Sequence, residues 1–176
     1  MKTETLNKEE SILAALRAIQ AKRPLRAEEI CRDYLQMNPG CADHLRLLGH
    51  ALMKQQRLDE AEKQLRFGIS LKPNFPQLHE DLGSVLALQG RHDEAVESLQ
   101  KAVQLDPSQA LAHKKLAQAL ALVGRGEDAD ESFQDYFDKR PDHGDIARGA
   151  NLMKEGATDE AIEVFRGVLQ NNPKHV

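Results

Sequence analysis

Proline recurs along the chain with an almost constant period. It stands at Pro39, Pro73, Pro107, Pro141 and Pro173, so that three successive intervals are equal and the fourth is slightly shorter. An alanine precedes each proline at one fixed distance, and an alanine or glycine precedes that alanine at the same distance. These two series are Ala27, Ala61, Ala95, Ala129 and Ala161, and Ala15, Gly49, Gly83, Ala117 and Gly149. Repetition with a period of about 34 residues predicts stacked supersecondary units, none of which buries its apolar face alone.

One unit, residues 76–109, indicates what each repeat folds into. Apolar residues recur at helical spacing over residues 82–88 and again over 95–103, and Gly90 lies between the two stretches. Pro107 ends the second stretch, because a proline disfavours α geometry in the residue before it. The small residues at fixed places allow two facing helices to approach closely. Each unit is therefore expected to be a helical hairpin.

The composition agrees with helices and excludes other classes of protein. Ala, Leu, Glu, Lys and Arg make up 84 of the 176 residues, whereas Val, Ile and Thr together supply 16 and Trp is absent. Strands favour β-branched and aromatic residues, so a β-sheet protein is disfavoured. The net charge of −4 argues against a nucleic-acid-binding protein, because that affinity depends on an excess of Lys and Arg.

Cysteine usage and hydropathy indicate the compartment. Cys31 and Cys41 are too few for a disulfide framework or a four-ligand zinc site, and Cys31 is expected in the core. No apolar run approaches the roughly 20 residues that span a bilayer. Residues 1–10 also lack the apolar stretch of a secretory signal. We therefore expect a cytoplasmic protein without membrane insertion.

The repeat pattern resembles that of the tetratricopeptide repeat (TPR) family. The family pattern has Leu, Gly or Ala, Ala and Pro at four fixed positions, and the unit 42–75 supplies Leu48, Gly49, Ala61 and Pro73 there. The resemblance implies an all-α, right-handed superhelix of five helix-turn-helix repeats and suggests a bacterial protein. The expected organisation is a tail over 1–7, a degenerate first repeat over 8–41, and repeats over 42–75, 76–109, 110–141 and 142–175.

Two departures from the pattern lie towards the C-terminus. The unit 110–141 is two residues short, which predicts an altered angle between the fourth and fifth hairpins. The chain stops at residues 172–176, where a capping helix would shield the last apolar face. We expect either that the chain is the N-terminal repeat region of a longer protein or that its open end pairs with a second copy.

In the family, the first helices of the repeats line a concave groove that binds a peptide or helix of a partner. Mapping the groove positions onto this chain predicts the following partner-binding residues: Ile12, Leu16, Ile19, Arg46, His50, Met53, Glu80, Asp81, Ser84, Lys114, Lys115, Gln118, Ile146 and Met153. The apolar stretch from Ile12 to Ile19 would supply affinity. The polar cluster of Arg46, His50, Lys114 and Lys115 would orient an acidic side chain or phosphate, unless these groups are ordinary solvated charges.

One well-known use of this groove in the family is a clamp for the acidic C-terminal tails of chaperones. The resemblance places Asp81 where that clamp needs an amide donor. A carboxylate ligand would meet a like charge there, which disfavours binding. A chaperone clamp is therefore not expected.

Charge is unevenly divided along the chain. Residues 1–75 carry 13 basic and 10 acidic groups, whereas residues 76–176 carry 11 basic and 18 acidic groups. Six acidic residues crowd one predicted helix: Glu127, Asp128, Asp130, Glu131, Asp135 and Asp138. The simpler interpretation is a solvated outer face. The alternative is head-to-tail association between the acidic second half and the basic first half.

The sequence contains no pattern typical of catalysis or metal binding. The seven histidines include no pair four residues apart on one helical face. His79 and His113 occupy the same place in successive repeats, but neighbouring helices stand about 8–10 Å apart, too far for a shared metal. Met53 and Met153 are expected to pack adaptably. We therefore expect no enzymatic activity, no cofactor and no metal site.

Three functions remain compatible with these observations. The first is a protein-interaction scaffold that binds a peptide or helix in the concave groove. The second is a recruitment or oligomerisation arm of a larger enzyme, because bacterial proteins with similar N-terminal repeats sometimes carry a sulfotransferase, glycosyltransferase or oxygenase domain. The third is a homo-oligomer that assembles through the uncapped C-terminal end.

Overall fold

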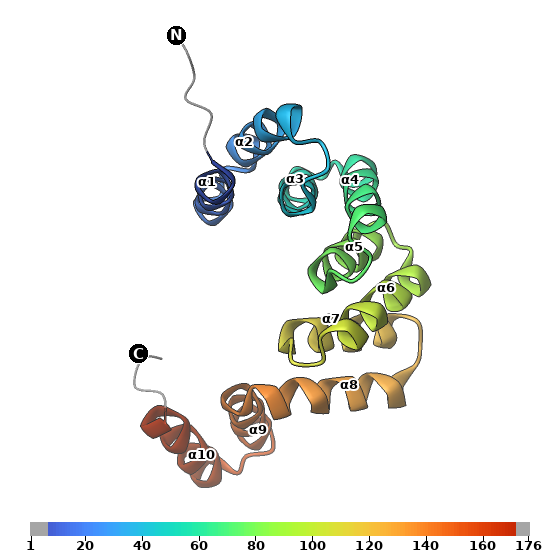
Figure 1. The fold of residues 1–176 in the computed structure, drawn as a ribbon. Coiled ribbons are helices and arrows are strands. Elements are labelled where there is room, and N and C mark those ends of the chain that lie inside the picture. The colour runs from blue at the N-terminus through green and yellow to red at the C-terminus, as the bar shows by residue number, and fades with distance from the viewer. Residues whose placement is uncertain (1–6, 172–176) are drawn as a thin grey trace.

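The computed structural model describes residues 7–171, which form ten α-helices joined by short turns (Figure 1). The helices are α1 (Lys8–Gln20), α2 (Pro24–Met37), α3 (Ala42–Lys54), α4 (Leu58–Leu71), α5 (Pro76–Leu88), α6 (His92–Leu105), α7 (Ala110–Leu122), α8 (Gly126–Lys139), α9 (Pro141–Lys154) and α10 (Thr158–Asn171). No strand occurs in this part of the chain. The expected all-α array of five helical hairpins is confirmed.

The hairpins follow one another along an arc, so the molecule has a concave and a convex side. The first helices of the hairpins, α1, α3, α5, α7 and α9, lie on the inner side of the arc in Figure 1, and the second helices lie on the outer side. Consecutive helices pack against each other along the whole array. Side chains at fixed places on α1, α3, α5, α7 and α9 therefore share one concave face.

The two helices of a hairpin approach closely at the recurring small residue. A Cβ atom added to Gly49 would lie 2.6 Å from Cγ of Leu65, and one added to Gly83 would lie 2.6 Å from Cγ of Leu99. Gly149 stands in the same relation to Phe165, at 2.5 Å from Cε1. The expected close approach is thus confirmed, and the large residue that fills the space comes from the second helix of the same repeat.

The turn inside each hairpin requires a residue in the left-handed region. Gly90 and Gly124 have φ of +78° and Gly156 has φ of +81°, values that glycine adopts without steric cost. Lys22 and Gln56 occupy the same place in the first two repeats and adopt φ of +56° and +61°. The repeat geometry therefore imposes the turn even where the sequence does not favour it.

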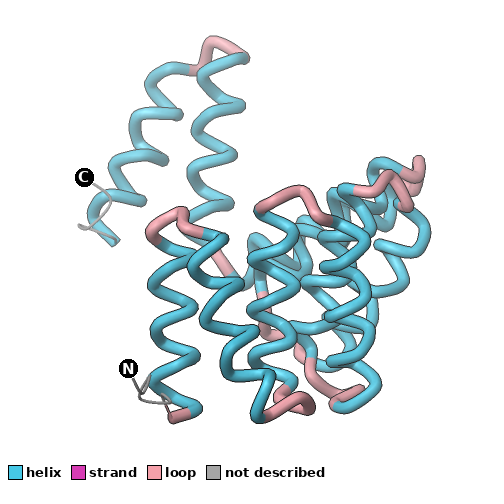
Figure 2. The backbone as a smooth tube through the Cα atoms, turned by 90° about the horizontal axis from the view of Figure 1, so that it is seen from above, coloured by secondary structure: helices cyan, strands magenta, loops and turns pink. Residues whose placement is uncertain are grey.

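The fifth hairpin is joined to the fourth differently from the other junctions. Four residues link α2 to α3, α4 to α5 and α6 to α7, but Arg140 alone separates α8 from α9. Pro141 is consequently the first residue of α9, and does not lie in a linker as Pro73 and Pro107 do. Among the described residues α7 and α9 make no contact, and Figure 2 shows α9 and α10 standing apart from the other helices. This arrangement agrees with the expected altered angle.

One of the two free cysteines lies in the core. Cys31 is fully buried, as expected, and burial raises the pKa of its thiol to about 12. None of the described helices is long and apolar enough to cross a membrane. The expected N-terminal tail, apart from Asn7, and the expected open end at 172–176 lie outside the described residues.

We predict that two Gly→Ala substitutions in helices have opposite effects on stability. Gly83→Ala forces a methyl group against Leu99 and is expected to lower the free energy of unfolding by about 1–3 kcal/mol. Gly167→Ala, where nothing lies within 4 Å of the added Cβ, is expected to raise it by about 0.5–1 kcal/mol. Urea denaturation followed by circular dichroism measures both, and equal effects would contradict the close approach in the hairpin.

Candidate partner-binding face

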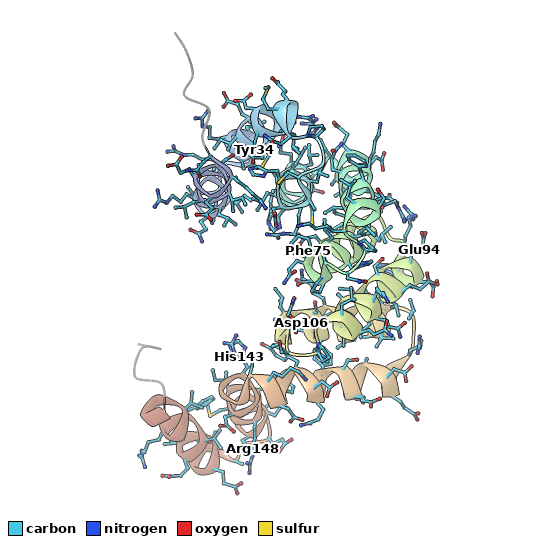
Figure 3. All side chains as sticks on the ribbon, in the orientation of Figure 1. Tyr34, Phe75, Glu94, Asp106, His143 and Arg148 are labelled. Carbon is cyan, nitrogen blue, oxygen red and sulfur yellow. The ribbon has the colours of Figure 1, made fainter. Side chains whose placement is uncertain are left out.

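The residues predicted to bind a partner lie on the inner helices α1, α3, α5, α7 and α9, but their exposure differs widely. Met53, Glu80 and Asp81 are buried, and Gln118, Ile146 and Met153 are exposed. The others have intermediate exposure: Ile12, Leu16, Ile19, Arg46, His50, Ser84, Lys114 and Lys115. Figure 3 shows the side chains along this inner side, with His143 projecting from the start of α9 towards it. We refer below to the inner surfaces of these five helices as the concave face.

Two ion pairs cross the concave face from one repeat to the next. Arg46 on α3 donates to Asp81 on α5, with 3.1 Å between Nη1 and Oδ2. Lys115 on α7 donates to Glu80 on α5, with 2.6 Å between Nζ and Oε1. Each pair joins residues 35 positions apart, which is one repeat plus one residue. Two of the cations expected to orient a ligand are thus already compensated by carboxylates of the same chain.

Asp81 is nearly enclosed, with 7% of its surface exposed, as is Glu80 in the other pair. Burial by itself would raise the pKa of this carboxyl, but His50, the Arg46 guanidinium and Lys115 together outweigh burial and hold it below its usual value. His50 Nδ1 lies 3.8 Å from Oδ1 of Asp81. Asp81 is therefore an ionised anchor between α3 and α5, which explains why a carboxylate stands at this position of the repeat.

Large apolar side chains are exposed on the concave face, mainly in its second half. Met53 and Leu47 are buried in α3, whereas the apolar residues at groove positions of α7 and α9 keep 40–63% of their surface exposed. These exposed residues are Leu111, Leu122, Ile146 and Met153, and Leu88 at the end of α5 is similar. In α1 the stretch from Ile12 to Ile19 is only partly exposed, since it packs against the core cluster of the first repeats.

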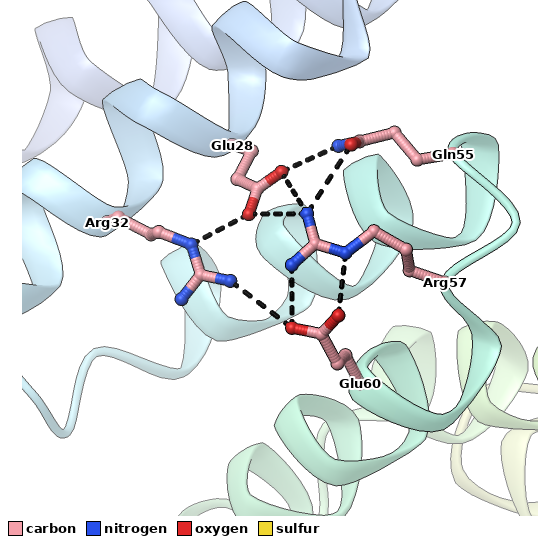
Figure 4. A network of polar contacts seen from close by, with 5 residues as sticks. All are labelled: Glu28, Arg32, Gln55, Arg57 and Glu60. Atoms are coloured by element: carbon pink, nitrogen blue, oxygen red, sulfur yellow. Dashed lines mark hydrogen bonds and ion pairs between the residues drawn. The ribbon is translucent and has the colours of Figure 1, made fainter.

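A polar network joins neighbouring repeats at the end of the hairpins. Glu28 on α2 accepts hydrogen bonds from Gln55, Arg57 and Arg32, and Arg57 also binds Glu60 (Figure 4). Burial tends to raise the pKa of Glu28, but these donors outweigh burial and lower it. The network therefore holds an ionised carboxylate between the first and second repeats.

The same network recurs between the second and third repeats and is absent, among the described residues, between the third and fourth. Glu62 accepts hydrogen bonds from Gln89, Arg91 and Arg66, and its pKa is lowered for the same reason despite burial. At the next junction Val96 and Val123 occupy the equivalent positions and belong to one apolar cluster. These contacts were not predicted from the sequence, although Glu28, Arg32, Gln55, Arg57 and Glu60 all recur one full repeat later.

His79 and His113, which occupy the same place in successive repeats, make specific hydrogen bonds to the linkers. Nε2 of His79 lies 2.8 Å from the carbonyl oxygen of Pro73, and Nε2 of His113 lies 3.0 Å from that of Pro107. A carbonyl oxygen only accepts, so Nε2 carries the proton in both residues. Each histidine thus ties its helix to the preceding linker. The described residues contain no cluster of three or more metal-ligating side chains.

A buried polar cluster that sequence analysis did not predict joins the first three helices. His44 on α3 is fully buried, with Nε2 3.0 Å from Oγ of Ser11 and Nδ1 3.2 Å from Sγ of Cys41. Its ring stacks on Tyr34 of α2, with 3.9 Å between centroids. Burial lowers the pKa of His44, so the ring stays neutral. The cluster satisfies polar groups in the core and has a structural role.

Comparison with known proteins identifies the family. One tetratricopeptide repeat model matches residues 12–66 and 46–110, and a second matches residues 86–151. The chain therefore belongs to the tetratricopeptide repeat family. No curated protein matches it.

Solved structures show the same architecture. A thermophilic TPR protein of Thermus thermophilus, TTC0263, has a TM-score of 0.74 at 18% identity over 96% of this chain and 93% of its own. A crystal structure of MamA has a TM-score of 0.66 at 21% identity over 91% and 95% of the two chains. An O-GlcNAc transferase mutant of Thermobaculum terrenum has a TM-score of 0.63 at 29% identity over 68% of this chain but only 23% of its own.

We predict that Asp81 contributes a pH-dependent part of the stability. Because its pKa is lower in the folded than in the unfolded chain, this contribution is complete above about pH 4 and is lost as the pH falls through the folded-state pKa. Asp81→Asn should lower the free energy of unfolding by about 1–3 kcal/mol at pH 7. The difference from the native chain should shrink towards pH 3. Thermal denaturation between pH 3 and 7 measures this, with exposed Asp33→Asn as the control.

Proposed function

We propose that the chain is a non-catalytic protein-interaction scaffold that binds a peptide or helix of a partner protein along its concave face. Membership of the tetratricopeptide repeat family supports a protein-interaction role. The observation that carries the proposal is the exposure of Leu111, Leu122, Ile146 and Met153 at groove positions of α7 and α9. Several large apolar side chains exposed on one side of an array are typical of an interaction site.

The paired polar residues of the concave face support a structural role for these side chains and not a catalytic one. Arg46 is engaged with Asp81, and Lys115 with Glu80, and both pairs join neighbouring repeats. Side chains that hold the scaffold together in this way are not free to act as a nucleophile or general base. The cytoplasmic location expected from the sequence stays a prediction.

A second candidate is a recruitment arm of a larger enzyme. It is favoured by the similarity to the Thermobaculum O-GlcNAc transferase, of which the chain spans about a quarter. The complete reading frame decides this candidate, since a stop codon directly after residue 176 would exclude it. The third candidate, self-assembly through the open end, concerns residues outside the described part. It predicts a mass above 19.7 kDa that rises with concentration in light scattering.

We predict that charges placed on the concave face abolish partner capture. The double variant Leu111→Asp/Leu122→Asp should reduce capture at least about tenfold, because each carboxylate replaces an apolar contact. Both side chains are more than half exposed, so folding should be preserved. Quantitative pull-down with a tagged chain, compared with the native protein, measures the effect.

The matched control is Leu25→Asp on α2, whose side chain is 71% exposed on the second helix of its hairpin. This variant should capture partners as well as the native chain does. Equal capture by the Leu111→Asp/Leu122→Asp variant, with an unchanged circular dichroism spectrum, would rule out the concave face as the binding surface.

A further inference from the structure

The two ion pairs of the concave face occupy equivalent positions of successive repeats, and the sequence gives the corresponding residues at the other junctions. In each junction the fifth residue of one repeat is matched with the sixth residue of the next. Along the chain these matches are Ile12 with Leu47, Arg46 with Asp81, Glu80 with Lys115, and Lys114 with Ala147. The first match is apolar, and the second and third are ion pairs. In the fourth, an alanine occupies the position of a charged partner for Lys114, and the described residues of α7 and α9 are not in contact.

Lys114 is therefore the charged residue of this series that has no oppositely charged residue at the corresponding position of the next repeat. It makes no ion pair within residues 7–171, and α7 and α9 are not in contact. Its Nζ lies 5.7 Å from the centroid of the Tyr136 ring, which belongs to α8. An aromatic face attracts and positions a cation but carries no net charge, so Lys114 is held in place without being neutralised.

Exposed apolar side chains share the face of α7 that carries this lysine. Leu111, Lys114, Gln118 and Leu122 recur at helical spacing and share one face of α7. Ile146 on α9 is exposed as well, and Lys154 lies two turns further along the same face of α9. The second half of the concave face thus combines exposed apolar side chains with a lysine, Lys114, that forms no ion pair among the described side chains, whereas Arg46 and Lys115 pair with Asp81 and Glu80.

We propose that the inner surface of α7 and α9 recognises an acidic amphipathic segment of a partner protein. A carboxylate of that segment pairs with Lys114, and the apolar residues beside it pack on Leu111, Leu122 and Ile146. This inference rests on the proposed function and names the chemistry of the partner. Recognition of acid is thereby assigned to Lys114 and not to Arg46 or Lys115, whose charges Asp81 and Glu80 already compensate.

Charge complementarity and shape select this occupant. The concave side of an arc cannot lie against a flat bilayer, so an anionic membrane does not fit (Figure 1). A nucleic acid would require a broad basic surface, but the chain carries a net charge of −4. The acidic residues of α8 confine the positive charge on this surface to single lysines, which can pair with single carboxylates only. A short segment with a few carboxylates among apolar residues satisfies both the apolar area and the single held lysine.

The test uses the full chain and three synthetic amphipathic peptides with the same leucine and isoleucine positions. The peptides differ only in carrying glutamate, glutamine or lysine at the remaining polar positions. Fluorescence anisotropy gives the dissociation constants at low and high salt. We expect the glutamate peptide to bind about three- to five-fold more tightly than the glutamine peptide at low salt, and the lysine peptide to bind most weakly. The preference should decline at high salt.

Lys114→Gln should remove most of the preference for glutamate while binding of the glutamine peptide stays unchanged. Lys63→Gln is the matched control, because this exposed lysine lies on α4 and the substitution changes the net charge by the same amount. Equal binding of the glutamate and glutamine peptides, a preference that survives Lys114→Gln, or no binding of the glutamate peptide would each overturn the inference. Binding to anionic-lipid vesicles that depends on Lys114 would overturn it as well.

These outcomes separate the inference from the proposed function. If the three peptides bind equally well and the Leu111→Asp/Leu122→Asp variant binds none of them, the scaffold function is supported and the acidic character of the partner is overturned. Failure of that double variant to reduce partner capture overturns the scaffold role itself, whatever the peptides do.

Discussion

The close contact between the two helices of each hairpin is the constraint on which the rest of the structure depends. A glycine or alanine on the first helix receives a large side chain of the second, as Gly49 receives Leu65 and Gly149 receives Phe165. This contact fixes the distance between the helices, and the turn at the left-handed position fixes their direction. Because every repeat obeys both conditions, the first helices line up on one side of the array and create the concave face.

The junctions between repeats are built from different interactions along the chain. The first two contain the polar network around Glu28 and Glu62, and the third replaces it with the apolar pair Val96 and Val123. At the fourth junction a single residue links α8 to α9, and α7 and α9 lose contact. The array is therefore tied together by charged groups at its beginning and is more open at its end. The inner surfaces of α7 and α9, on the two sides of this fourth junction, carry the exposed apolar side chains and Lys114.

Much of the fold could be predicted from the sequence because its constraints are local and repeated. The recurring prolines marked most of the linkers, although the short unit places Pro141 inside α9. The residues predicted to bind a partner lie on the inner helices, since their positions follow from helical periodicity, and their binding role stays a prediction. Their availability could not be predicted in the same way. Arg46 and Lys115 are cations at groove positions, as expected of a site for an acidic ligand, yet they form ion pairs with Asp81 and Glu80 of the same chain. Likewise His44 and Glu28 were not recognised, because their partners come from neighbouring repeats.

The sequence by itself determined the hairpin, the number of repeats and the face that each helix turns inward. These properties depend on spacing within one repeat and on how often that spacing recurs, both of which are visible along the chain. The tertiary structure alone decided which charges of the concave face neutralise one another. That outcome depends on how far each repeat is displaced against the next, since the displacement brings the fifth residue of one repeat opposite the sixth residue of the following one. Stacking of whole hairpins sets this displacement between α3, α5 and α7. At the last junction α7 and α9 are not in contact, and Lys114 has no ion-pair partner among the described side chains.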